Sequence, residues 1–338
     1  MAAVVDRQPN PYRPGFNQPP GVLAGRDEAL AAAREALEVA ALDGRTPRPL
    51  VLIGTRGVGK TVLLGEIAAL AAEAQGWLTV SVEIRPGTPF LPQLIERLGA
   101  ARELLAGTPR GRRFKVERVT ARAAVLGAGA EVAVVRPPSA EPPVDLALER
   151  ALAMVMADAT SRRSGLVLTV DELQLASRPE LAELAATLQQ HVPDGWPLVV
   201  ALAGLPTIRD GHRSVTYLER SEWHELGMLS HDDAVRALVG PAADAGRPLT
   251  PAAADLLAAA SGGYPYAVQV LGHHAWRASS GQRTITEDHA RAALPRAEAD
   301  LATALYAGRW ADASAKEREY LAAVAATRVP FLSSRSRR

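Results

Sequence analysis

The sequence contains no cysteine, and this absence excludes disulfide bonds, thiolate metal sites and cysteine nucleophiles. It also fits a reducing compartment. Seven scattered histidines show no metal-ligand spacing, and the neighbours His273 and His274 are better explained as helix residues than as a metal site. Aromatic residues make up only 4% of the chain, so alanine-rich helices must fill much of the interior.

Long apolar runs and one-sided charge are missing as well. The first twenty residues carry prolines and charges where a secretory signal has an apolar core, and no stretch approaches the ~18 apolar residues of a membrane span. We therefore expect a cytoplasmic protein without membrane contact. A net charge of +1 argues neither for nor against nucleic acid. The 338 residues, 48% hydrophobic, have room for two or three domains with sizeable cores.

Lysine is scarce, since only Lys60, Lys115 and Lys316 occur among 38 basic residues. Lys60 ends the pattern G-x-x-x-x-G-K-T over residues 54–61, which follows the apolar strand 50–53 and precedes an apolar helix. This is the sequence form of a phosphate-binding loop, or P-loop. The alternative, a plain glycine turn between strand and helix, does not require lysine at this position.

Each residue type in the loop has a physical reason. Gly54, Gly57 and Gly59 let the backbone bend so that successive N–H groups and the helix N-terminus face phosphate oxygens. Lys60 would reach the β- and γ-phosphates, and the Thr61 hydroxyl would bind Mg²⁺. The loop residues expected to bind ATP are Gly54, Thr55, Arg56, Gly57, Val58, Gly59, Lys60, Thr61 and Val62.

A P-loop enzyme also needs an acidic strand end, and residues 166–172 supply one. Leu166 to Val170 is apolar except for Thr169, which suits a parallel strand covered on both faces. Asp171 would bind Mg²⁺, and Glu172 would activate the attacking water. Taken alone, the two acids could equally begin a helix. Downstream of a P-loop, the catalytic interpretation is favoured.

Strands alternating with helices predict an α/β fold, a P-loop three-layer parallel sheet with helices on both faces, followed by a small all-α domain. Residues 1–21 are rich in proline and glycine and predict an extended arm rather than a packed element. Helices are expected at 28–42, 60–75, 91–105, 145–161 and 179–191, and strands at 50–53, 77–84, 165–170 and 198–203. Beyond 225 only helices are expected, at 231–239, 250–260, 264–279, 286–305 and 314–327.

The alternation breaks at residues 110–136, which predict an inserted β-hairpin. Its segment 110–122 carries six basic residues against one acid, Glu117. A solvated hairpin face and a contact with the DNA backbone both explain this charge.

Together these features resemble the AAA+ ATPases, in the branch that links origin-recognition-like ATPases to signal-transduction ATPases. The resemblance covers about residues 20–327. The specific support for the resemblance comes from residues 22–28, the P-loop 54–61 and the acids 171–172 taken together. Residues 203–206 and 262–265 are suggestive.

The resemblance implies roles for further residues. Gly25 and Arg26 would line the adenine pocket, and Tyr264 with Pro265 would match a motif that faces the phosphates. It divides the chain into the arm 1–21, a nucleotide-binding α/β domain 22–225, a helical lid domain 226–310, and a remnant of a winged-helix start with a basic tail at 311–338. Relatives form rings, so we expect a homo-oligomer in the ATP state.

Ring-forming relatives complete the site with an arginine from a neighbouring subunit. Arg220 is the best-placed residue for this role, with Arg213 behind it, and a surface salt bridge to Glu219 or Glu222 explains Arg220 equally well.

Two departures from the family pattern predict slow hydrolysis. Tyr266 stands where many relatives have a lid arginine. A polar sensor is expected at the end of strand 198–203, yet Gly204 follows it and Thr207 is the nearest hydroxyl.

Four functions follow, in order of support. The first is an ATP-hydrolysing switch with nucleotide-dependent self-association, with ATP and Mg²⁺ as cofactors. The second is a DNA-binding ATPase in replication initiation or transposition-like loading. A non-hydrolysing nucleotide scaffold and a small-molecule phosphotransferase are the remaining alternatives.

Overall fold

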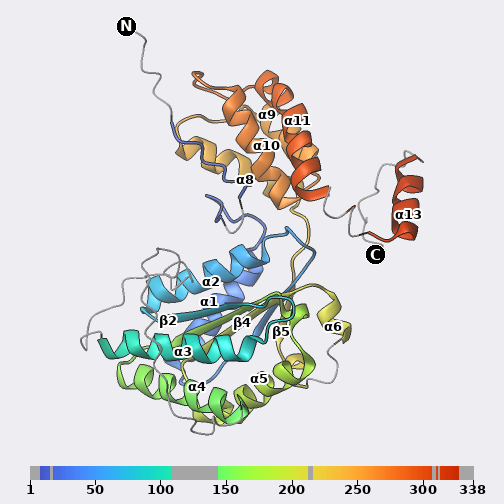
Figure 1. Cartoon of the computed structure of the whole chain (residues 1–338). Helices are drawn as coiled ribbons and strands as arrows, with labels where there is room; N and C mark the ends of the chain where they lie inside the picture. The colour runs from blue at the N-terminus through green and yellow to red at the C-terminus, as the bar shows by residue number, and fades with distance from the viewer. Residues whose placement is uncertain are drawn as a thin grey trace, which may run out of the picture. The chain divides into compact units, whose positions relative to one another are not determined.

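The computed structural model describes residues 8–15, 18–107, 144–211, 216–306, 310 and 313–326, and they form two compact units. One unit, residues 15–19 and 23–230, is built on a five-stranded, all-parallel sheet (Figure 1). The predicted α/β class is confirmed. The strand order is β2-β3-β4-β1-β5, with β1 (Leu50–Ile53), β2 (Leu78–Glu83), β3 (Leu166–Asp171), β4 (Leu198–Gly204) and β5 (Glu222–Glu225).

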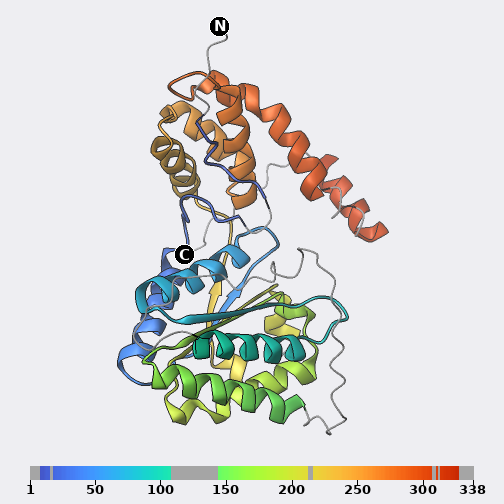
Figure 2. The ribbon, with the colours of Figure 1, turned by 60° about the vertical axis from the view of Figure 1, so that its left-hand side comes forward.

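Helices cover both faces of this sheet, which makes three layers (Figures 1 and 2). The apolar side chains of one face share a core with α1 and α2, and those of the other face share a core with α3, α4 and α5. These helices are α1 (Asp27–Leu42), α2 (Lys60–Gln75), α3 (Phe90–Gly107), α4 (Val144–Ser161) and α5 (Arg178–Gln190).

Burial on both faces explains the unbroken apolar runs of the inner strands. In β1, Leu50 and Leu52 lie in the core with α1 and α2, whereas Val51 and Ile53 lie in the opposite core. Every residue of β1, β3 and β4 is buried. Such strands need apolar side chains at successive positions, because neither face meets water.

The fifth strand is absent from the sequence prediction. Glu222–Glu225 pairs in parallel with β1, with Leu52 opposite His224. Of its four residues only His224 is buried, so the segment has no apolar run to mark it as a strand. Two short helices, α6 (Thr207–Gly211) and α7 (Thr216–Glu219), precede it.

The other unit contains residues 231–326 together with parts of the N-terminal arm, and it is helical. All five expected helices are present, although α8 continues through Pro241 and ends five residues beyond the expected position. They are α8 (His231–Asp244), α9 (Pro251–Ser261), α10 (Pro265–Ala278), α11 (Glu287–Leu301), which a π-helical turn Ala302–Tyr306 follows, and α13 (Ala315–Ala326). None of the described helices combines the length and apolarity needed to span a bilayer.

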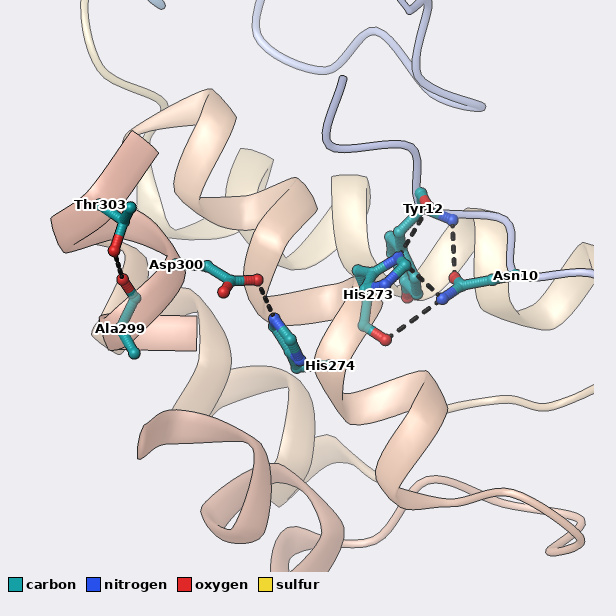
Figure 3. A network of polar contacts seen from close by, with 7 residues as sticks. All are labelled: Asn10, Tyr12, His273, His274, Ala299, Asp300 and Thr303. Carbon is teal, nitrogen blue, oxygen red and sulfur yellow. Dashed lines mark hydrogen bonds and ion pairs between the residues drawn. The ribbon is translucent and has the colours of Figure 1, made fainter. Parts of the chain in front are cut away.

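The N-terminal arm lacks helix and strand over its described residues, as expected, but it is packed, and that part of the prediction is wrong. Tyr12 is only 2% exposed, and its hydroxyl donates to Leu238 O of α8 at 2.5 Å. Asn10 donates to His273 O of α10 at 3.2 Å (Figure 3). Asn10 and Tyr12 of the arm are therefore part of the packed helical unit.

Candidate functional site

The P-loop joins β1 to α2 and has the backbone shape that its glycines predict. Gly57 and Gly59 have φ values of 82° and 96°, in the left-handed region that side chains disfavour. Gly54 is required for space, because an ideal Cβ on it would lie 2.5 Å from Leu226 O. The loop therefore packs closely against the chain that follows β5.

Lys60 begins α2 and points its ammonium back into the loop. Its Nζ donates to the carbonyls of Gly54 and Thr55 at 2.9 Å each, and the residue is only 7% exposed. Burial lowers the pKa of Lys60, and the nearby Asp171 and Glu172 carboxylates oppose that shift. Both of these hydrogen-bond partners are carbonyl oxygens, which carry no net charge.

The next residue, Thr61, meets the acidic end of β3. Its hydroxyl donates to Asp171 Oδ2 at 2.5 Å, while Asp171 Oδ1 accepts from the Glu172 N–H at 2.8 Å. Burial raises the pKa of Asp171, although both hydrogen bonds and Lys60 favour its ionised form. The hydroxyl and the carboxylate that were assigned to one metal ion are in direct contact.

Glu172 lies directly after β3 in a left-handed conformation, with φ 58° and ψ 40°. Among the described non-glycine residues only Arg163 shares a positive φ. The carboxylate of Glu172 accepts a hydrogen bond from Gln174 Nε2, and Gln174 Oε1 accepts from the Leu205 N–H at 3.0 Å. Gln174 is absent from the residues predicted from the sequence, although its place two residues after Glu172 was a signal.

Arg26 connects three segments around the loop. Its guanidinium donates to the carbonyls of Gly25 and Val58 at 2.9 Å and of Gly227 at 2.8 Å. The residue is 7% exposed. Arg26 therefore holds the P-loop in place, and its predicted contact with adenine stays a prediction.

The remaining predicted residues lie in several parts of the chain. Tyr264 and Pro265 lie at the start of α10 in the helical unit, and Arg220 is exposed between α7 and β5, so their roles stay predictions. Thr55 and Arg56 are exposed on the P-loop, and Val62 is half-buried on α2. Arg213 and the basic insertion 110–136 lie outside the described residues.

An all-parallel sheet with a P-loop after β1 and an acid pair at the end of β3 defines a P-loop nucleoside-triphosphatase fold. The family model described as AAA ATPase domain matches residues 22–201, more than half of the chain. The chain belongs to this family. No curated protein matches it significantly.

Solved structures agree with this fold. The Cdc6p of Pyrobaculum aerophilum is 15% identical, with a TM-score of 0.53 over 80% of this chain and 67% of that one. The Orc1 protein of Aeropyrum pernix, solved in complex with DNA, is 17% identical, with a TM-score of 0.49 over 83% and 67% of the two chains. The RuvB branch-migration motor of Thermotoga maritima is 15% identical, with a TM-score of 0.48 over 80% and 69%. The fold is thus similar to that of Cdc6p, as the origin-recognition-like resemblance predicts.

Proposed function

We propose that this protein binds ATP with Mg²⁺ and hydrolyses it as a molecular switch whose ATP and ADP states differ in self-association. One observation carries the proposal. Thr61, from the helix that follows the P-loop, contacts Asp171, from the end of β3, while Lys60 is buried beside them. A chain that used the loop only as a turn would not need to bury an ammonium beside a carboxylate.

Phosphate binding would use groups that are already in place. The Lys60 ammonium now bonds the carbonyls of Gly54 and Thr55, and it would exchange these partners for β- and γ-phosphate oxygens. The N–H groups at the start of α2 add a partial positive charge. The Lys60 ammonium and these N–H groups would both favour a ligand with several negative charges.

The donor atoms also fit Mg²⁺. Thr61 and Asp171 offer a hydroxyl and a carboxylate, the hard oxygen ligands that Mg²⁺ prefers. The described residues hold no cluster of three or more histidine or acidic side chains that could bind a metal. Water and phosphate oxygens would complete the coordination, as is usual for Mg²⁺. When bound, the ion neutralises charge on the phosphate oxygens.

Glu172 would be the catalytic base. It would accept a proton from water as the water oxygen bonds to the γ-phosphorus and the bond to the bridging oxygen breaks, which releases ADP. A protein that only holds nucleotide does not need this second acid.

Self-association would complete the site. Arg220 is exposed and can reach another copy, where its guanidinium would offset the negative charge of the γ-phosphate. The helical unit, with Tyr264 at the start of α10, would act as a lid that responds to the nucleotide.

Two substitutions separate binding from hydrolysis. Lys60→Ala should abolish ATP binding in calorimetry, whereas Glu172→Gln should retain binding and lose about 10²-fold or more of the phosphate-release rate. Lys316→Ala on the exposed helix α13 is the matched control and should change neither. Absence of ATP binding by the unaltered protein would refute the proposal.

The shared site has its own test. Arg220→Ala and Glu172→Gln should each be inactive alone, and mixing them should restore part of the turnover if arginine and glutamate come from different copies. If mixing restores no turnover, and the protein has the same molecular mass in solution with ATP as with ADP, self-association is removed from the proposal.

The same assays address the alternatives. A DNA-handling ATPase should release phosphate faster with duplex DNA, and its DNA binding should weaken steeply as salt rises. A scaffold would bind ATP with no phosphate release. A phosphotransferase would need an acceptor molecule for turnover.

A further inference from the structure

The side-chain amide of Gln174 links two segments that are far apart in the sequence. Gln174 lies in the short 3₁₀ turn Leu173–Leu175 that follows the acid pair. Its Nε2 donates to Glu172 Oε2, and its Oε1 accepts from the Leu205 N–H, directly after β4, at 3.0 Å. One planar group therefore connects the expected base to the end of the neighbouring strand.

The direction of this amide is fixed by its partners. The two ends of a glutamine amide have nearly the same shape, so their assignment depends on the hydrogen bonds. A backbone N–H can only donate, so the Leu205 N–H requires Oε1. The NH₂ group must then face the Glu172 carboxylate, which can only accept when ionised.

The local backbone explains why residue 174 returns toward residue 172. Glu172 is left-handed, and the Leu175 N–H donates to its carbonyl at 2.9 Å, which closes a tight turn. Leu173 is fully buried and anchors that turn in the core. The turn therefore leaves Gln174 half-buried beside the acid.

Gly204 provides the space for this arrangement. An ideal Cβ on Gly204 would lie 3.0 Å from Gln174 Oε1 and 3.2 Å from Ile208 Cδ1. A polar side chain at the end of β4 would compete with the amide for this position. Gly204, at the position where a polar sensor is expected, therefore leaves room for the side chain of Gln174.

We infer that Gln174 is a positioning residue for Glu172, and that its amide supplies, from the turn after β3, the polar group that the end of β4 lacks. The inference rests on the proposed function, because it concerns how Glu172 is held for hydrolysis. The amide binds one carboxylate oxygen and leaves the other able to accept from water. It also limits the rotamers of Glu172.

Two substitutions of Gln174 test the two hydrogen bonds. Gln174→Met keeps the length of the side chain and loses both bonds. Gln174→Glu keeps an acceptor for the Leu205 N–H but places a second carboxylate against Glu172. Both substitutions should lower kcat by about 10-fold and leave the affinity for ATP unchanged. This loss is a part of the rate acceleration of about 10²–10⁴-fold that general-base catalysis supplies. Gln189→Met on the exposed face of α5 is the control.

A double-mutant cycle isolates the coupling to Glu172. In a Glu172→Gln background, Gln174→Met should cause no further loss of kcat, because no base remains to be positioned. Multiplicative losses would overturn the inference. If Glu172→Gln alone hydrolyses ATP like the parent, the proposed role of Glu172 fails instead.

Hydrogen exchange gives a readout without turnover. The Leu205 amide should exchange faster in Gln174→Met than in the parent and should stay protected in Gln174→Glu, with the unfolding temperature of both variants unchanged. Equal exchange of Leu205 in the parent and Gln174→Met would show that the amide does not hold this segment, and would overturn the inference.

Discussion

The hydroxyl of Thr61 donates to Asp171 Oδ2 at 2.5 Å, which joins the first turn of α2 to the end of β3. Burial raises the pKa of Asp171, so the folded protein without nucleotide disfavours the ionised carboxylate that Mg²⁺ would need. The site therefore costs stability until its ligand binds.

Asp171→Asn should stabilise the protein without nucleotide and prevent Mg²⁺-dependent ATP binding. The amide removes the buried charge but can still accept from the Glu172 N–H. In thermal unfolding at pH 8, each 1 kcal/mol gained should raise the transition by about 2–4 °C. A lower transition temperature would contradict the prediction.

The advantage of Asp171→Asn should depend on pH. Because the folded pKa is raised above the ordinary 3.8, the carboxylate penalises folding above its folded pKa and progressively less as pH falls toward 3.8. The difference in unfolding temperature between parent and variant should therefore shrink on acidification. An unchanged difference between pH 8 and pH 4 would show that ionisation of Asp171 is not the cause.

Arg26→Lys should weaken both stability and ATP affinity. A single ammonium cannot span the carbonyls of Val58 and Gly227, which the guanidinium bonds at 2.9 and 2.8 Å. Hydrogen bonds to charged groups contribute about 1.5–3 kcal/mol each, so urea unfolding should show a loss of that order. Arg34→Lys, on the exposed face of α1, is the control and should unfold like the parent.

Gly54→Ala should displace the P-loop. The added Cβ would lie 2.5 Å from Leu226 O and 2.8 Å from Val58 Cγ2, and overpacking of this kind costs about 1–3 kcal/mol. We expect a lower unfolding temperature and weaker ATP binding in calorimetry. Gly65→Ala, in α2 where a Cβ meets nothing within 4 Å, should instead stabilise by about 0.5–1 kcal/mol. Equal effects of the two substitutions would argue against the close packing of Gly54.

Gly272→Ala should destabilise the helical unit, against the usual preference of helices for alanine. Its Cβ would lie 2.5 Å from two carbons of the Tyr12 ring, so the arm would be displaced. Gly99→Ala in α3, with open space around its Cβ, should stabilise by about 0.5–1 kcal/mol. In a Tyr12→Ala background Gly272→Ala should become stabilising. A destabilising effect that persists there would exclude Tyr12 as the cause.

Much of the fold could be predicted because periodicity and glycine placement are local signals. The inner strands have continuous apolar runs, and Gly59 with Lys60 marks where α2 begins. By contrast, β5 is an edge strand paired only with β1, so half-exposed Glu-Trp-His-Glu carries no strand pattern.

The site was predictable only in part, for a related reason. The P-loop directly follows β1 and Asp171 ends β3, and the spacing of residue types shows their chemistry. The contact of Gln174 with Leu205 spans 31 residues and depends on the left-handed turn at Glu172, which no local propensity favours for glutamate. Tyr12 likewise finds its acceptor 226 residues away.

That separation has a consequence for how the protein is made. Tyr12 leaves the ribosome early, but its partner Leu238 is synthesised 226 residues later, and its partner Gly272 later still. Until they are synthesised the aromatic ring lacks these partners, so this contact forms later than contacts between neighbouring segments. A tag, a cleavage or a chaperone acting on the nascent N-terminus would therefore influence the maturation of helices that the ribosome has not yet produced.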